Sequence, residues 1–251
     1  MINSIVAGNW KMNTTQEEAI ALAGDIKQNI ELTVGTKTII CPPFISLTSI
    51  KDVLKGTNIG LGAQNMHFES KGAFTGETSP NMLATLCEYV ILGHSERRQY
   101  FGEQDDTVNK KILAAQSIGL IPIMCVGENL QDRQDGQASQ VVSSQIKNGL
   151  HSVSDSNNLI VAYEPIWAIG SGIAASGEIA EEMMGTIRQA LSDLYGHEKA
   201  YDVPLLYGGS VNADNVHEFA SQPNINGALV GGASLNPKAF AEIVEGFSIT
   251  E

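Results

Sequence analysis

The sequence predicts an α/β fold, namely a single closed (β/α)8 barrel that takes up residues 1–251. Eight short apolar runs alternate with eight longer amphipathic stretches along the chain. Strands separated by helices run parallel, because each crossover returns the chain to the same edge of the sheet. No linker, low-complexity run or shift in composition divides the chain, so one barrel domain is expected.

The expected strands are short and rich in β-branched or aromatic residues, which favour extended backbone. In chain order they are Ile5–Trp10, Thr38–Cys41, Ile59–Ala63, Tyr89–Leu92, Ile121–Cys125, Leu159–Tyr163, Leu205–Tyr207 and Ala228–Val230. An open, doubly wound sheet is the alternative arrangement of such units, and it predicts a GxGxxG turn after the first strand. The first strand ends in Gly8-Asn9-Trp10-Lys11 instead, which favours the closed barrel.

The expected helices lie between these strands and carry apolar residues at helical spacing. In chain order they are Gln16–Ile30, Ile45–Leu54, Pro80–Cys87, Thr107–Ser117, Ser139–Leu150, Gly177–Tyr195, Ala213–Ala220 and Pro237–Glu245. Ser95 begins a further short helical stretch at a capping position. The pairing of each strand with a following helix is the repeat from which a barrel is built.

Composition excludes several classes of protein. The formal net charge is −13 and the pI about 4.7, which disfavours binding to nucleic acid. An anionic substrate would need local positive potential at its site. Three scattered cysteines make no disulfide framework, and no stretch resembles a signal peptide or a membrane span. We therefore expect a cytoplasmic protein without nucleic-acid or membrane partners.

The residues that follow the strands are the first candidates for an active site, because barrels build theirs at the carboxyl ends of the strands. Glu164 ends the sixth strand and precedes a hydrophobic loop that leads to Gly170-Ser171-Gly172. A carboxylate kept dry at a strand end is suited to act as a general base. The alternative is a surface glutamate at a strand terminus.

Two further groups complete the predicted constellation. His94, before the expected helix start at Ser95, could donate a hydrogen bond to a carbonyl oxygen, and the helix terminus is expected to lower its pKa. Lys11, with Glu96 as its anchor, could attract phosphate or offset oxyanion charge. A structural histidine and a solvated lysine are the alternatives. Glycines at three strand ends offer backbone N–H groups to phosphate: Gly170-Ser171-Gly172, Gly208-Gly209-Ser210 and Gly231-Gly232.

Motifs along nearly the whole chain resemble those of the triosephosphate isomerase family, whose fold is the TIM barrel. The motifs are Gly8–Asn13, Gly72–Glu77, Gly93–Arg98, Cys125–Glu128, Ala162–Gly170, Tyr207–Val211 and Ala228–Leu235. The resemblance implies interconversion of dihydroxyacetone phosphate and glyceraldehyde 3-phosphate, as in glycolysis and gluconeogenesis, without cofactor or metal. A metal-dependent phosphosugar epimerase is the alternative function, but it needs His and Asp ligands from several strand ends, and only His94 fits.

The resemblance also implies roles for individual residues. Glu164 would move the proton between C1 and C2, while neutral His94 would stabilise the enediolate with help from Lys11 and Asn9. Backbone amides of Gly170, Ser210, Gly231 and Gly232 would bind the phosphate, and the segment Pro165–Ser176 would close over the substrate. The family is usually a homodimer, and the loop Phe68–Ser79, including Thr75, resembles its interlocking arm, with Gln64 and Asn65 near the contact.

The chain departs from the family pattern at Gly177. In the family, the helix that follows the segment Pro165–Ser176 usually starts with a proline. Because proline preorganises the first helical position, the sequence predicts that Gly177→Pro raises thermal stability.

Overall fold

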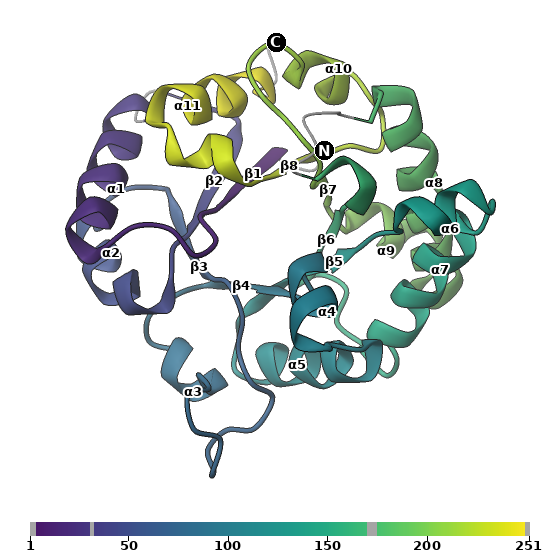
Figure 1. Cartoon of the computed structure of the whole chain (residues 1–251), viewed down its shortest axis with the longest axis horizontal. Helices are drawn as coiled ribbons and strands as arrows, with labels where there is room; N and C mark the ends of the chain where they lie inside the picture. The colour runs from purple at the N-terminus through teal and green to yellow at the C-terminus, as the bar shows by residue number, and fades with distance from the viewer. Residues whose placement is uncertain (1–3, 31–32, 170–174, 249–251) are drawn as a thin grey trace.

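The computed structural model describes residues 4–30, 33–169 and 175–248. Eight strands in this part of the chain form a closed parallel barrel in the order β1 to β8, with β1 also paired to β8 (Figure 1). Their bounds are β1 Ser4–Asn9, β2 Thr36–Cys41, β3 Gly60–Ala63, β4 Tyr89–Leu92, β5 Ile121–Val126, β6 Ile160–Tyr163, β7 Leu205–Tyr207 and β8 Gly227–Val230. The predicted fold class is confirmed.

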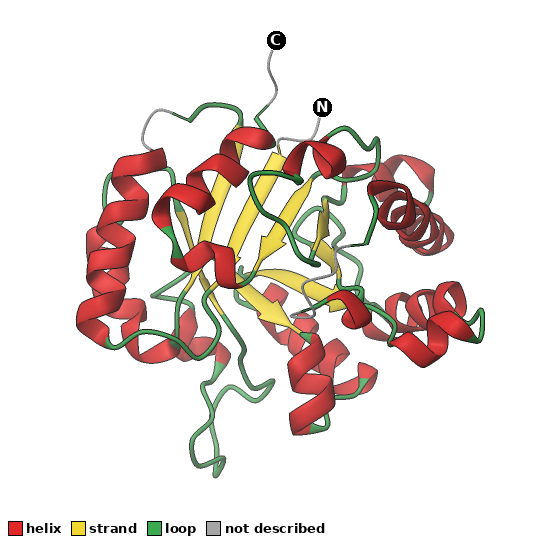
Figure 2. Cartoon of the chain, turned by 45° about the horizontal axis from the view of Figure 1, so that its top comes forward, coloured by secondary structure: helices red, strands yellow, loops and turns green. Residues whose placement is uncertain are grey.

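Helices surround the barrel, as Figures 1 and 2 show. They are α1 Gln16–Ile30, α2 Leu47–Val53, α3 Pro80–Leu83, α4 Ser95–Phe101, α5 Asp105–Ser117, α6 Leu130–Gln134, α7 Ala138–Gly149, α8 Gly177–Tyr195, α9 His197–Asp202, α10 Val216–Ala220 and α11 Pro237–Gly246. Short 3₁₀ helices occur at η1 Phe44–Ser46, η2 Ile166–Ala168 and η3 Gly232–Leu235. The eight expected helices are present, although α3 and α10 are shorter than predicted and α6 and α9 were not foreseen.

The core has two layers, because side chains alternate between the two faces of each strand. An inner cluster fills the barrel with residues such as Ala7, Ile39 and Ile123. A larger cluster, which includes Val6 and Ile40, packs the outer faces of the strands against the helices. Burial on both faces explains why the strands read as continuous apolar runs. That all of residues 1–251 form one domain stays a prediction.

One loop leaves the barrel. Residues 64–79, between β3 and α3, project away from the ring of helices in both views (Figures 1 and 2). Its aromatic side chains pack within the loop, since His67 lies 4.3 Å from Phe68 and 4.2 Å from Phe74 between ring centroids. Of the helices in the described ranges, none combines the length and hydropathy that a bilayer crossing demands. The cytoplasmic location stays a prediction.

The start of α8 contradicts the prediction made for Gly177. Ser176 caps the helix through Ile179, as a helix start requires, but the Gly177 N–H also donates to Glu218 Oε1 on α10 at 2.6 Å. A Cβ on Gly177 would lie 2.8 Å from Glu218 O and 2.9 Å from Gln222 Nε2. Proline would remove the donor and crowd α10, so the contacts of Gly177 argue against the predicted gain in stability.

We expect Gly177→Pro to lower the melting temperature instead. A lost hydrogen bond and steric crowding together cost about 2 kcal/mol, or roughly 4–8 °C for a protein of this size. Differential scanning calorimetry measures the change. Gly185→Ala on the same helix is the control, because a Cβ there meets no atom within 4 Å, and alanine should raise stability. A melting temperature of Gly177→Pro at or above that of the parent would contradict this account.

Candidate active site

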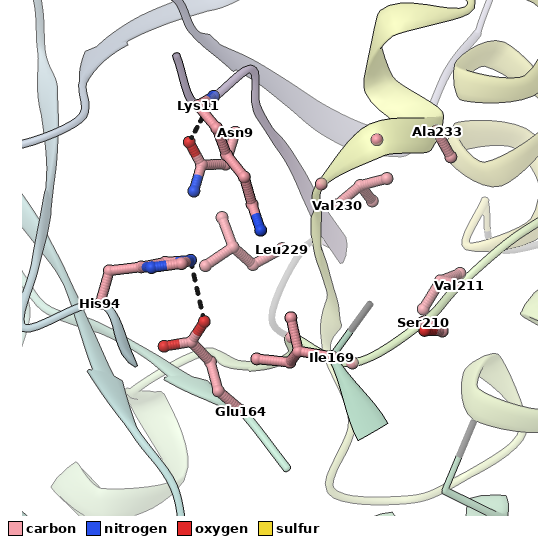
Figure 3. A pocket seen from close by; sticks show the side chains of 14 residues that line it. Asn9, Lys11, His94, Glu164, Ile169, Ser210, Val211, Leu229, Val230 and Ala233 are labelled. Atoms are coloured by element: carbon pink, nitrogen blue, oxygen red, sulfur yellow. Dashed lines mark hydrogen bonds and ion pairs between the residues drawn. The ribbon is translucent and has the colours of Figure 1, made fainter. Parts of the chain in front are cut away.

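The carboxyl ends of the strands surround a cavity of about 230 Å³. Every predicted site residue within the described part of the chain lines this cavity: Asn9, Lys11, His94, Glu164, Ser210, Gly231 and Gly232. Gly170 lies outside the described residues. Figure 3 shows the side chains of Lys11, His94 and Glu164 directed toward one another. β1, β4 and β6 thus bring together groups that lie 153 residues apart in sequence, counted from Lys11 to Glu164.

Glu164 directly follows β6 and is only 2 % exposed. Its backbone N–H donates to Val126 O at 2.7 Å, which ties the residue to the end of β5. Its carboxylate accepts hydrogen bonds from Ser95 N at 2.9 Å and Ser95 Oγ at 3.3 Å. Burial alone would raise the pKa of Glu164, but His94, Ser95 and Lys11 lower it below its ordinary value. The side chain is therefore an anion in this arrangement, available to accept a proton.

His94 precedes α4 and acts as its N-cap. Its Nδ1 accepts a hydrogen bond from Glu96 N at 3.2 Å, so Nε2 carries the ring hydrogen and faces Glu164 Oε1 at 3.0 Å. Burial lowers the pKa of His94, but the charge and hydrogen bond of Glu164 raise it by more. The predicted lowering of this pKa is wrong, because the carboxylate of Glu164 lies beside the ring.

Lys11 follows β1 with a left-handed backbone at φ 54°, which is uncommon for a residue with a side chain. Its backbone N–H donates to Asn9 Oδ1 at 3.1 Å. Its Nζ binds Glu96 Oε1 at 2.7 Å, as the sequence predicted. The side chain is 29 % exposed, so the ammonium is anchored on one side and open to the cavity on the other. It supplies local positive potential in a strongly acidic protein.

The other wall of the cavity comes from β7, β8 and the residues after them. Gly232 begins η3 and Gly231 is its N-cap, and a Cβ on Gly231 would lie 3.4 Å from Lys11 Cε. Ser210 Oγ donates to Ala168 O at 3.1 Å, which joins the β7 end to η2. Main-chain groups beside a lysine form a pocket suited to a phosphate dianion.

The hydrogen bonds by which three further residues support the site were not predicted from the sequence. Ser95 holds the Glu164 carboxylate, and Gln64 Nε2 donates to Lys11 O and Cys41 O at 2.8 Å each. Glu128, which is fully buried, accepts from Tyr163 Oη at 3.0 Å and Trp167 Nε1 at 2.8 Å. Glu128 lies in a motif at the end of β5. Glu164 was identified by its position at the end of a strand, and the same criterion could have identified Glu128.

A metal-dependent epimerase would need several side chains that converge on one metal ion. In residues 4–30, 33–169 and 175–248, no three His, Cys, Asp or Glu side chains gather in a way that could hold a metal ion. The carboxylates nearest the cavity instead bind His94 and Lys11.

Comparison with known proteins decides the family. The family model described as triosephosphate isomerase matches residues 4–247. The chain belongs to the triosephosphate isomerase family. Its similarity to the triosephosphate isomerase of Dehalococcoides mccartyi (strain CBDB1) is 53 % identity over 239 residues, covering 95 % of this chain and 94 % of the relative.

Two further relatives are also triosephosphate isomerases. The triosephosphate isomerase of Thermoanaerobacter pseudethanolicus is 49 % identical over 247 residues, with 97 % of this chain and 99 % of the relative covered. That of Carboxydothermus hydrogenoformans is 49 % identical over 249 residues, with 98 % and 99 % covered. Membership in this isomerase family confirms the resemblance, and none of these findings supports the epimerase alternative.

Proposed function

We propose that this protein interconverts dihydroxyacetone phosphate and D-glyceraldehyde 3-phosphate by proton transfer through an enediolate. The observation that carries the proposal is the buried pair of Glu164 Oε1 and His94 Nε2, 3.0 Å apart beside the Lys11 ammonium. Base, hydrogen-bond donor and cation are the three groups that this isomerisation requires. The reaction needs no redox cofactor, because the substrate and product are isomers.

Binding is the first step. The phosphate would lie against the main chain of Ser210, Gly231 and Gly232, with Gly170 contributing from the segment after β6. Lys11, which faces the same cavity, would attract the dianion. With the phosphate fixed on the β7 and β8 side, C1 and C2 of the triose lie toward Glu164 and His94.

Proton transfer follows. Glu164 leaves its hydrogen bonds to Ser95 and takes a proton from C1 of dihydroxyacetone phosphate, and the C–H electrons form the C1–C2 double bond of the enediolate. His94 Nε2–H and Lys11 stabilise the oxygen that becomes negative, assisted by Asn9. Glu164 raises the pKa of His94 while the two side chains are in contact. Once Glu164 has moved toward the substrate, this effect weakens, and the neutral form of the His94 ring is favoured. The hydroxyl proton on the C1 oxygen then moves to the C2 oxygen, and Glu164 returns its proton to C2, which leaves the C1 carbonyl of the aldose.

A coupled assay tests the proposal. The purified protein is incubated with glyceraldehyde 3-phosphate, and dihydroxyacetone phosphate is measured through its dehydrogenase, with and without a chelator. We expect turnover that the chelator leaves unchanged. No turnover would contradict the isomerase proposal, and turnover abolished by the chelator and restored by a divalent metal would favour metal-dependent chemistry.

We also infer a homodimer formed through the loop of residues 68–79, with Thr75 entering the partner's site region. Large apolar side chains that a monomer leaves in water support this inference, since Met12 is 97 %, Phe101 68 % and Phe74 45 % exposed. Met12 and Phe101 line a second cavity of about 380 Å³ that adjoins the active site through Lys11 and His94. The loop of residues 68–79 from a second copy, which carries the exposed side chain of Phe74, would cover these groups.

Substitution of Met12 by aspartate tests the interface. In a monomer the new charge stays in water and changes little, whereas in the inferred dimer it is buried without a partner. We expect sedimentation at low micromolar concentration to show a dimer for the parent and mainly monomer for Met12→Asp. Val34→Asp is the matched control, because Val34 is also apolar and 84 % exposed. A parent that sediments as a monomer, or a dimeric Met12→Asp, would contradict the interface.

A further inference from the structure

The peptide of Gly127, directly after β5, is held from both sides by one side chain. Gln145 on α7 accepts from Gly127 N through Oε1 at 2.8 Å and donates through Nε2 to Gly127 O at 3.0 Å. This pairing reproduces the two hydrogen bonds of a neighbouring strand. The side-chain amide therefore extends the hydrogen bonding of the sheet by one residue beyond the end of β5.

Gly127 in turn lies against the main chain of Glu164. A Cβ on Gly127 would lie 1.8 Å from Glu164 O and 2.7 Å from Glu164 C, so only glycine allows this approach. The residues on either side of Gly127 bind the same segment, since Glu164 N donates to Val126 O at 2.7 Å and Ile166 N donates to Glu128 O at 3.1 Å. The position of Gly127 consequently sets the position of the Glu164 backbone.

We propose that Gln145 is a positioning residue for Glu164. Both hydrogen bonds of its side-chain amide go to Gly127, and they fix the peptide on which the backbone of the base rests. The inference deepens the proposed isomerisation and rests on it. A carboxylate that must take a proton from carbon requires alignment within a fraction of an ångström, so freedom at Gly127 would lower the rate of the proton transfer.

The test removes the side-chain amide of Gln145 but keeps a side chain of similar size. Gln145 borders an open polar groove of about 450 Å³, so a small side chain would admit water to Gly127, whereas methionine fills the space and offers no strong donor or acceptor. We expect Gln145→Met to lower kcat about tenfold and to leave KM within about twofold of the parent. An enediolate mimic that carries a phosphate should bind about tenfold more weakly, while inorganic phosphate should bind unchanged.

Two variants complete the design. Gln140→Met carries the same substitution on an exposed position of α7 and should match the parent in every measurement. Gln145→Asn keeps the amide but shortens its reach, and it is expected to lose kcat as the methionine variant does; it also serves if Gln145→Met fails to fold.

Two results would overturn the positioning role: kcat of both Gln145 variants within twofold of the parent, or equal weakening of the mimic and of inorganic phosphate. Failure of the proposed isomerisation is read separately, from the activity of the parent enzyme alone.

Discussion

Glu164→Asp is expected to lower kcat by about 100-fold or more while KM changes by less than about threefold. Aspartate keeps the carboxylate but withdraws it by one C–C bond, about 1.5 Å. The backbone of residue 164 is fixed by Val126 and Gly127, so the shortened side chain cannot recover this distance by moving the main chain. Proton transfer from carbon is sensitive to this longer distance, because the carboxylate oxygen must be aligned with the C–H bond.

KM is expected to change little because the groups proposed to hold the phosphate, at Ser210, Gly231 and Gly232, lie on the opposite wall of the cavity. Steady-state kinetics in both directions measure the two parameters. Glu178→Asp, at an exposed position in the first turn of α8, is the matched control and should leave both unchanged. A Glu164→Asp enzyme with the turnover of its parent would remove the role assigned to Glu164.

Glu103→Leu is expected to destabilise the folded protein by about 3–5 kcal/mol. Glu103 and Lys111 form an ion pair whose side chains are 5 % and 4 % exposed, and Arg97 Nε binds the same Glu103 Oε1 at 2.6 Å. Without the carboxylate, two cations remain close together, and within the described residues Lys111 is left with its hydrogen bond to Asn65 Oδ1 at 2.8 Å. An uncompensated buried charge is more costly than the apolar replacement can offset.

Urea unfolding at a fixed protein concentration measures this difference, and Asp106→Leu is its control. Asp106 pairs with Lys110 at 3.5 Å, but both side chains are more than half exposed, so the loss should stay below about 1 kcal/mol. Equal losses in the two variants would contradict the importance given to the buried pair.

The stability that Glu103 contributes depends on pH. Burial alone would raise the pKa of Glu103, but hydrogen bonds and charges from Arg97 and Lys111 lower it below its ordinary value of 4.5. A depressed carboxyl pKa contributes stability that is fully present above the unfolded value and is lost as pH falls through the folded value. The gap in unfolding free energy between parent and Glu103→Leu should therefore narrow as pH falls below about 4.5.

Much of the fold could be predicted because strands and helices differ in hydrophobic period. Tyr89–Leu92, Leu205–Tyr207 and Gly177–Tyr195 form with the predicted bounds. The short helices α6 and α9 were not predicted, since five or six residues give too few turns for a periodic signal. The role of Glu218 could not be predicted for another reason. Its hydrogen bond to Gly177 joins α10 to α8 across 41 residues, and this contact reversed the expected effect of proline.

The candidate site was predictable as a set of residue types and less so as an electrostatic environment. The rule that barrel sites lie at the carboxyl ends of strands placed Lys11, His94 and Glu164 together before any contact was known. The direction of the His94 pKa could not be predicted, because it depends on the 3.0 Å approach of Glu164 from another strand. The support from Gln145 depends likewise on how α7 packs against the end of β5.

Isotope transfer from solvent tests the central claim, that Glu164 carries the proton between the two carbons. Dihydroxyacetone phosphate is converted in deuterium oxide and the product is examined by proton NMR, because a carboxylic acid proton exchanges with solvent during the lifetime of the enediolate. We expect glyceraldehyde 3-phosphate that carries deuterium at C2 from the parent enzyme, and at least a 100-fold slower reaction from Glu164→Gln. A product that retains all of its original hydrogen, formed equally fast by both proteins, would contradict the account.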